Sequence, residues 1–126
     1  MPTEIIISTG ELKVPATLND SPTGQALAAA LPFTGQAQRW GEEIYFPVPQ
    51  VAAALDDTAS AVVDVGDLGY WPPGRAFCIF FGLTPASVPG EIRPASAVNL
   101  VGRVSGDPCC LTAVAEGEEV RVEKKA

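Results

Sequence analysis

The sequence predicts a mainly β protein, a closed eight-stranded antiparallel β-barrel with one or two capping helices. Three observations carry this prediction. Twelve prolines and twelve glycines among 126 residues, without a low-complexity run, indicate many turns between short elements. Short segments in which apolar and polar residues alternate recur along the chain, as in strands with one buried face. Residues 76–81 are wholly apolar, which indicates a strand buried on both faces.

The first third of the chain predicts two strands and then a helix. Residues 4–18 alternate in two runs around a turn, as in a hairpin. Asp20 or Ser21 is a suitable N-cap, and Pro22 suits the first position of a helix. Pro32 ends the helix, and the alanine and leucine face is expected to pack on the sheet.

The middle of the chain predicts two more strands and one short helix. Residues 33–40 have strand character. In residues 44–48, Ile44, Phe46 and Val48 alternate with Tyr45 and Pro47, as in a strand. Residues 50–55 are compatible with a short helix. Residues 62–63 are compatible with a brief strand before the aromatic segment that follows.

Residues 66–82 predict an aromatic-rich hairpin. Pro73 and Gly74 fit the second and third positions of a type II turn, because proline presets φ and glycine accepts a positive φ. The apolar second strand, residues 76–81, is expected between the barrel interior and a covering helix. Residues 83–94 are rich in proline and glycine and predict a loop that flanks a binding cleft.

The last part of the chain completes the expected barrel. Residues 98–104 and 119–123 alternate as strands, and residues 111–114 predict a short helix. Neither an internal repeat nor a linker interrupts the sequence. Its length fits one domain spanning residues 1–126.

The net charge of −7 argues against nucleic-acid binding, because an acidic surface repels phosphate groups. The sequence starts without a basic leader and contains no long apolar run, so we expect a cytoplasmic location and no membrane contact. The chain has no histidine, which excludes Ser-His-Asp and Cys-His catalysis.

Three cysteines without histidine offer almost no ligands for a metal, and no metal or other cofactor is expected. Cys78 lies in the apolar strand and is expected in the core. For the adjacent Cys109 and Cys110, a redox role and a tolerated pair in a loop or strand edge both stay open, because neighbouring cysteines rarely bridge each other.

Aromatic and acidic residues are the first candidates for a binding cleft. Tyr70 and Trp71 offer a stacking surface, although such a pair more often packs a barrel end. Arg39, Glu42 and Glu43 form a candidate polar cluster at a pocket mouth, since paired carboxylates perform acid–base chemistry where their environments differ. For the two glutamates, exposed turn positions are the favoured interpretation.

Two further polar residues are candidates for the same cleft. Arg75, after the predicted turn, would bind a carboxylate or pair with Asp67 across the hairpin. Asn99 is a polar residue within an apolar strand, so it faces the same pocket or bonds the backbone in a structural role.

Residues 40–46, 66–82 and 94–104 resemble the small bacterial and archaeal cyclophilin-like proteins of uncharacterised function, and Gly-Tyr-Trp-Pro-Pro-Gly at 69–74 is the most specific part. The resemblance implies a cyclophilin-type barrel of eight antiparallel strands with helices over the ends. Because cyclophilins are prolyl isomerases, it also implies pocket positions. The pocket glutamine falls at Ala76, a phenylalanine at Cys78 and the histidine near Val98.

Most of a prolyl isomerase groove is therefore missing, and Arg39 is the only arginine in the part of the chain where the catalytic arginine is expected. A binding module for a small molecule or an extended peptide, without efficient isomerase activity, is the favoured function. A weak or atypical prolyl isomerase, or a carboxylate-dependent enzyme, stays open. So does an assembly role, as a homo-oligomer or a subunit of a larger complex, which a large exposed apolar patch would favour.

Overall fold

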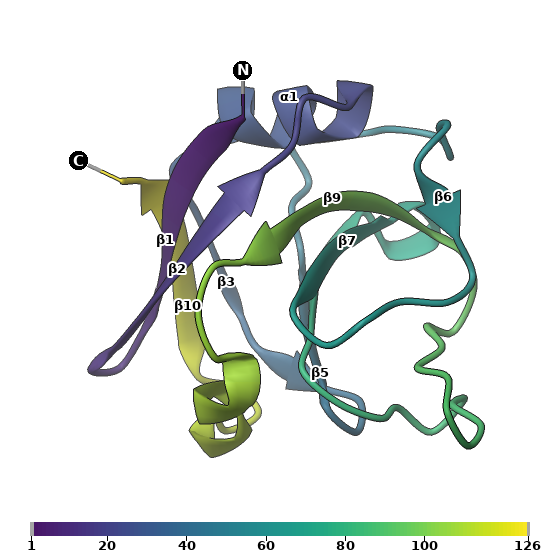
Figure 1. Ribbon diagram of the computed structural model, residues 1–126. Coiled ribbons are helices and arrows are strands. Elements are labelled where there is room, and N and C mark those ends of the chain that lie inside the picture. Colours follow the sequence, from purple (N-terminus) through teal and green to yellow (C-terminus); the bar gives the residue numbers. More distant parts are fainter. Residues whose placement is uncertain (1, 126) are drawn as a thin grey trace.

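Antiparallel strands of a single sheet form the wall of a barrel in residues 2–125, the part of the chain that the computed structural model describes (Figure 1). The strands are β1 (Thr3–Thr9), β2 (Leu12–Leu18), β3 (Phe33–Gln36), β4 (Gln38–Arg39), β5 (Glu43–Pro47), β6 (Ala59–Ser60), β7 (Asp67–Trp71), β8 (Ala76–Phe80), β9 (Val98–Val104) and β10 (Glu119–Lys124). The helical elements are α1 (Pro22–Ala30) and the 3₁₀ turns η1 (Pro72–Gly74) and η2 (Pro108–Ala113).

The sheet curls until its two ends nearly meet. Its strand order is β3-β10-β1-β2-β9-β7-β8-β5-β4, with β6 paired to β9 off this path. The end strands β3 and β4 are two halves of one segment that bends at Ala37. The Ala37 amide donates to the Glu118 carbonyl at 2.8 Å, and its carbonyl accepts from Gly117 at 2.7 Å. The predicted barrel is therefore confirmed, and this bend adds a ninth strand to its wall.

The main core fills the barrel interior. Inward residues of the alternating strands are buried there, as the alternation predicts, and Leu27 of α1 is buried over the barrel end. The rings of Phe33, Phe46 and Phe77 pack together, with centroids 5.6, 5.7 and 6.2 Å apart. These tilted and edge-on contacts are the favourable geometries for aromatic pairs.

A second, smaller core lies on the outer face of the sheet. The prediction that the apolar strand is buried on both faces is confirmed, since every residue of β8 is buried. Cys78 and Phe80 belong to the outer core, as does Ala76, and Cys78 is thus a core residue as expected. The predicted covering helix is wrong. Val63 and Ile92, which lie outside the strands, pack against this face instead, beside Val98 of β9.

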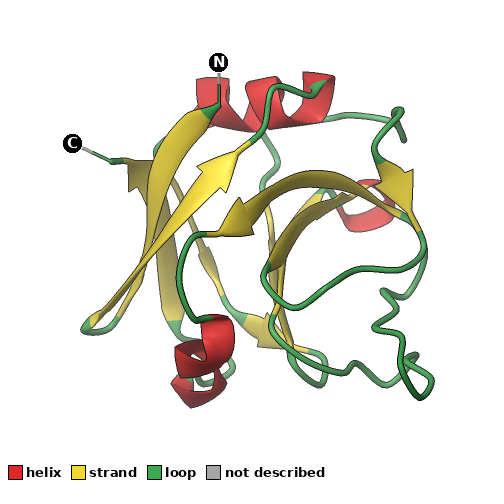
Figure 2. Cartoon of the chain, viewed as in Figure 1, coloured by secondary structure: helices red, strands yellow, loops and turns green. Residues whose placement is uncertain are grey.

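The helices lie over the two ends of the barrel, with α1 across one end and η2 at the other (Figure 2). The N-cap of α1 is Ser21, whose hydroxyl oxygen accepts from the Gly24 amide at 3.0 Å. Residues 111–114 were expected to be helical, and η2 covers most of them as 3₁₀ turns. Cys110 of η2 is exposed, whereas the Cys109 side chain lies outside the described part of the chain.

The predicted helix over residues 50–55 is wrong. The Tyr70 hydroxyl donates to the Val51 carbonyl at 2.9 Å and accepts from the Ala53 amide at 3.3 Å. The Asn99 amide group donates to the Ala54 carbonyl at 3.0 Å. Buried side chains thus bond the backbone groups that a helix would have paired with one another, and residues 51–56 form no regular secondary structure.

Two local predictions in residues 59–75 are corrected as well. The brief strand is β6, at Ala59–Ser60, while Val63 forms an isolated bridge to Ile92. The type II turn is wrong, because η1 occupies Pro72–Gly74 and the positive φ, 48°, falls on Arg75. Among the described helices, none is both long and apolar enough to span a membrane.

Candidate functional site

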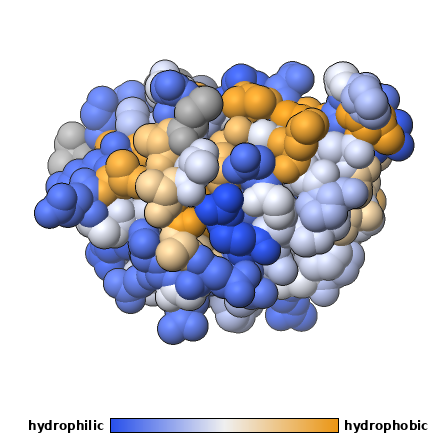
Figure 3. Space-filling view, turned by 90° about the horizontal axis from the view of Figure 1, so that it is seen from below, coloured by the Kyte–Doolittle hydropathy of each residue, from blue (hydrophilic) through white to orange (hydrophobic). Residues whose placement is uncertain are grey.

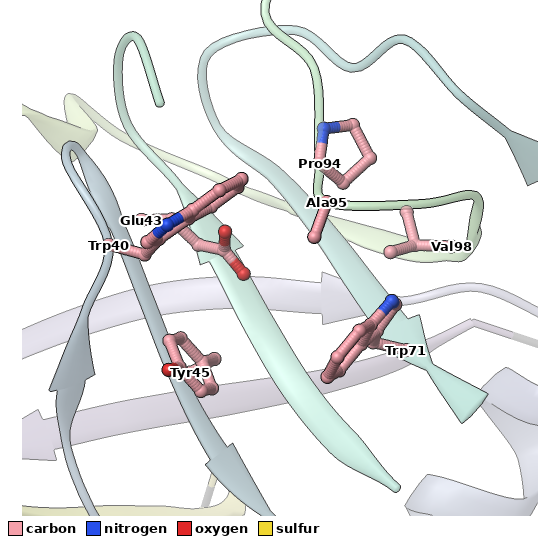
Figure 4. Close-up of a pocket in the computed structure, with 7 residues that line it drawn as sticks. All are labelled: Trp40, Glu43, Tyr45, Trp71, Pro94, Ala95 and Val98. Atoms are coloured by element: carbon pink, nitrogen blue, oxygen red, sulfur yellow. The ribbon is translucent and has the colours of Figure 1, made fainter. Parts of the chain in front are cut away.

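A cleft of about 250 Å³ opens on the outer face of the barrel, between β5, the end of β7 and the loop that precedes β9. Figure 4 shows its side chains, with the Glu43 carboxylate directed into the space between the two tryptophan rings. Three aromatic side chains, one carboxylate and three small apolar residues line it: Trp40, Glu43, Tyr45, Trp71, Pro94, Ala95 and Val98.

The β4–β5 hairpin places Trp40 directly opposite Glu43. The Trp40 amide donates to the Glu43 carbonyl at 3.0 Å and closes a two-residue turn. Gly41 in this turn has φ +63°, which favours glycine. A Cβ at Gly41 would also lie 2.8 Å from the Leu83 carbonyl oxygen. The glycine therefore allows the hairpin to close against the loop and bring the ring and carboxylate together.

The alternation of β5 directs Glu43 and Tyr45 to the outer face while Ile44 and Phe46 enter the main core. Glu43 is nevertheless 6 % exposed, so the favoured interpretation of this residue as an exposed turn position is wrong. The outer face at this point forms part of a cleft that the loop before β9 also lines.

Trp71 is held from two sides at the end of β7. Its indole nitrogen donates to the Ser96 hydroxyl at 2.7 Å. Its ring packs against Gly74, where a Cβ would lie 2.9 Å from the ring. The ring is therefore fixed in position before any ligand arrives, which lowers the entropy cost of binding.

Burial dominates the electrostatics of the cleft. It raises the pKa of Glu43 from 4.5 to about 7, and a hydrogen bond with the Cys78 side chain offsets part of this rise. Burial and the neighbouring Glu43 charge raise the pKa of the Cys78 thiol well above its ordinary value. Within residues 2–125, no lysine or arginine forms an ion pair with Glu43.

Comparison with known proteins identifies the family. The family model described as cyclophilin-like matches residues 3–123. The chain belongs to the cyclophilin-like family. This cyclophilin-like protein is also similar to a hypothetical protein from Archaeoglobus fulgidus with a solution structure, at 41% sequence identity and a TM-score of 0.80. The match covers 98% of this chain and 95% of the archaeal one. No curated protein matches the chain.

These findings confirm the family resemblance that the sequence indicated, together with its implied barrel. Of the seven candidate residues in this cyclophilin-like protein, Glu43 and Trp71 line the cleft. Arg39 and Glu42 do not. The Arg39 guanidinium donates to the carbonyls of Val114 at 2.7 Å and Thr112 at 3.3 Å, and it pairs with Glu42 at 3.5 Å.

The other three candidates lie elsewhere. Tyr70 and Asn99 are fully buried, and both bond the backbone of the segment that follows β5. Arg75 is exposed at the η1 turn. Its alternative pairing with Asp67 is wrong, because Arg103 on the adjacent strand holds that carboxylate at 2.5 Å.

Sequence reasoning left five lining residues out of the candidate site. The alternation of β5 would have found Tyr45, because it shares a face with Glu43. The hairpin turn would have found Trp40 opposite Glu43. The remaining three residues have no sequence pattern that indicates a cleft. They reach it only in the folded protein, two from the loop before β9 and one from β9 itself: Pro94, Ala95 and Val98.

The cleft lining combines aromatic surface with a single carboxylate. The aromatic rings supply apolar and π surface, and the one carboxylate supplies a hydrogen-bond acceptor or a negative charge. In the described part of the chain, no group of three His, Cys, Asp or Glu side chains lies close enough to hold a metal ion.

Proposed function

We propose that this cyclophilin-like protein is a binding module whose cleft accepts one compact group of a small molecule or of an extended peptide. The observation that carries the proposal is the aromatic cleft itself, in which Trp40, Tyr45 and Trp71 surround the buried Glu43 carboxylate. Concave sites with aromatic walls and a few placed polar groups are typical of ligand pockets.

The size of the cleft limits the ligand. Its volume of about 250 Å³ lies just below the range of roughly 300–1,000 Å³ that is usual for drug-sized ligands. One side chain or a small organic molecule fits such a space. Because strands and the fixed Trp71 ring form its walls, the site is largely organised before binding.

Binding is favoured over catalysis by what surrounds Glu43. Arg39 bonds carbonyl groups away from the cleft, and Arg75 lies on an exposed turn, so neither basic candidate supports a reacting group there. Glu43 and Tyr45 are the ionisable side chains that line the cleft. General acid–base catalysis would depend on one of them, without a positioned cationic partner.

An assembly role has less support. On the face drawn in Figure 3, hydrophobic residues are interspersed with hydrophilic ones. The large hydrophobic residues of the described chain that are exposed are few: Leu55, Val62, Val65 and Leu83. Single exposed apolar side chains are normal on a soluble domain.

The test uses tryptophan fluorescence, because the chain has two tryptophans and both line the cleft. A library of neutral, cationic and anionic small molecules and short peptides is titrated against the full chain, with thermal shift as a second readout. At least one class should change the emission saturably and raise the melting temperature. Trp71→Ala should remove that response, and Val65→Ser, an exposed site outside the cleft, should retain it. The absence of a saturable response from every class would overturn the proposal.

A further inference from the structure

The chemistry of the cleft walls points to the charge of the ligand. Trp40, Tyr45 and Trp71 present aromatic rings, and Glu43 directs its carboxylate between the two indoles (Figure 4). Aromatic faces carry negative electrostatic potential and attract organic cations. None of the seven lining residues is basic, so the cleft combines π surface with a single negative group.

Glu43 and Asp67 are the buried acidic residues of the described chain, and they differ in their partners. Arg103 pairs with Asp67, and Arg93 pairs with Glu91 at 3.1 Å, whereas no described basic residue pairs with Glu43. Burying a charged carboxylate without a counter-ion costs free energy. Such a group is therefore a candidate for binding a ligand that supplies the opposite charge. The protein as a whole carries a net charge of −7, which also favours a cationic ligand.

We propose that the cleft binds a small organic ammonium group, held by the aromatic faces of Trp40, Tyr45 and Trp71 with Glu43 as its counter-ion. This inference rests on the proposed binding function and specifies its ligand. The ammonium group comes either from a free small amine or from a lysine side chain of an extended peptide. An inorganic divalent cation is a poor alternative, because such ions require several oxygen ligands and the cleft supplies one carboxylate.

Cation binding requires Glu43 to be ionised, so affinity depends on pH. Burial raises the pKa of Glu43 to about 7 in the free protein, and a bound cation favours its charged form. The groups that face it are Tyr45 from β5 and the Cys78 thiol from β8, whose pKa is raised well above its ordinary value. The two arginines next in sequence to lining residues form their own pairs, Arg39 with Glu42 and Arg93 with Glu91. The chain has no histidine that would add a titration near neutral pH.

The experiment compares choline with 3,3-dimethyl-1-butanol, a neutral molecule of the same shape, by tryptophan fluorescence on the full chain. We expect choline to bind about tenfold or more tightly than the alcohol at pH 8. Choline affinity should fall about tenfold between pH 8 and pH 6, because protonation at a pKa near 7 removes the counter-ion. The alcohol should show no such pH dependence.

Two matched variants locate the effect. Glu43→Gln should weaken choline binding and abolish its pH dependence. Glu42→Gln removes the adjacent carboxylate, which lies outside the cleft, and should bind choline as the parent chain does. N-acetyl-lysine methylamide, titrated in parallel, identifies the source: tighter binding than choline indicates a peptide lysine, and weaker binding indicates a free amine.

The outcomes separate this inference from the proposed function. Equal binding of choline and the alcohol, or choline binding that Glu43→Gln leaves intact, overturns the ammonium inference while the binding function stands. Binding of an anionic or neutral class with no binding of either ammonium probe does the same. If the protein responds to none of the ligand classes, both the proposed binding function and the ammonium inference are overturned.

Discussion

The Arg39 guanidinium lies over the ring of Phe81, with its central carbon 5.1 Å from the ring centroid. The same group donates to the carbonyls of Val114 and Thr112 near η2 and to the Gly41 carbonyl in the β4–β5 turn. Arg39 thus connects the bent end of the sheet to the segment after η2. Its contacts are those of a residue that stabilises the barrel beside the cleft.

Arg39→Ala is accordingly expected to lower stability and spare the cleft. Loss of the stacking contact and of several charge-assisted bonds should reduce the free energy of unfolding by about 1–3 kcal/mol. Urea unfolding measures the loss. Arg121→Ala is the matched control, because its one ion pair, with Glu123, is exposed and should be worth less than about 0.5 kcal/mol. Equal losses in the two variants would contradict the structural role given to Arg39.

Glu43→Gln is expected to stabilise the protein at high pH. In the unfolded chain the carboxyl titrates near 4.5, and in the folded protein burial raises its pKa to about 7. The folded state therefore holds the proton more tightly, and the free energy of unfolding falls as the pH rises from about 4.5 to about 7 and is then constant. The neutral amide avoids this loss, which amounts to about 3 kcal/mol.

Urea unfolding of Glu43→Gln and the parent chain across this pH range provides the test. The two should have similar stability near pH 4.5 and differ most above pH 7, in favour of the variant. Glu42→Gln, whose side chain is partly exposed beside Arg39, should follow the parent at every pH. A parent stability that rises between pH 5 and 7 relative to Glu43→Gln would refute the assigned burial effect. A stabilising substitution at this position would support a binding role for the native carboxylate.

Asn99 holds the segment after β5 against the barrel. Its amide group donates to the Thr23 hydroxyl at 2.8 Å and to the Ala54 carbonyl at 3.0 Å, and its carbonyl oxygen accepts from the Asp56 amide at 2.9 Å. Because Asn99 is fully buried, Asn99→Ala removes these bonds from the Ala54 carbonyl and the Asp56 amide and should cost about 2–4 kcal/mol, whereas the Thr23 hydroxyl keeps its bond to the Asp56 carboxylate.

Hydrogen exchange distinguishes this role from a general loss of packing. The Asp56 amide should lose protection in Asn99→Ala by more than the amides of β1 and β2 do. Ser60→Ala, which removes a local bond to Val62, should change stability by less than about 1 kcal/mol and leave the Asp56 amide protected. Uniform loss of protection throughout the barrel would show that Asn99 does not anchor this segment specifically.

The strands could be predicted where one face of the pleat is apolar. Residues 44–46 show the rule: Ile44 and Phe46 enter the core as their alternation requires. The segment at 50–55 shows its limit. Its composition suits a helix, but Tyr70 and Asn99, distant in sequence, take its backbone bonds. Only the folded barrel brings those donors and acceptors together.

The site was predictable only in part, for a related reason. Trp71 and Glu43 were found from residue type, but exposure of Glu43 was inferred from its place beside a turn. Glu43 lines a cleft together with Pro94 and Ala95, which the loop before β9 contributes from a distant part of the sequence. Arg39 was a candidate because its charge is conspicuous in the sequence, whereas its partners near η2 are more than seventy residues away.

The final prediction concerns prolyl isomerase activity. Catalysis of this reaction requires an apolar groove for proline and a donor that stabilises the twisted amide. The aromatic cleft offers the first, but Arg39 already donates to carbonyls outside it, and none of the lining residues is basic. Efficient isomerisation is therefore not expected, although the chain belongs to the cyclophilin-like family.

An assay on an unstructured Ala-Pro-Phe peptide tests this expectation, with a true cyclophilin as the positive control. The uncatalysed reaction takes on the order of tens of seconds, so even modest acceleration is visible. At high protein concentration the rate should stay at the uncatalysed value. Acceleration that Trp71→Ala abolishes would make the aromatic cleft a weak isomerase site. Acceleration that Arg39→Ala also abolishes, with the fold intact, would mean that Arg39 leaves its carbonyl partners during catalysis.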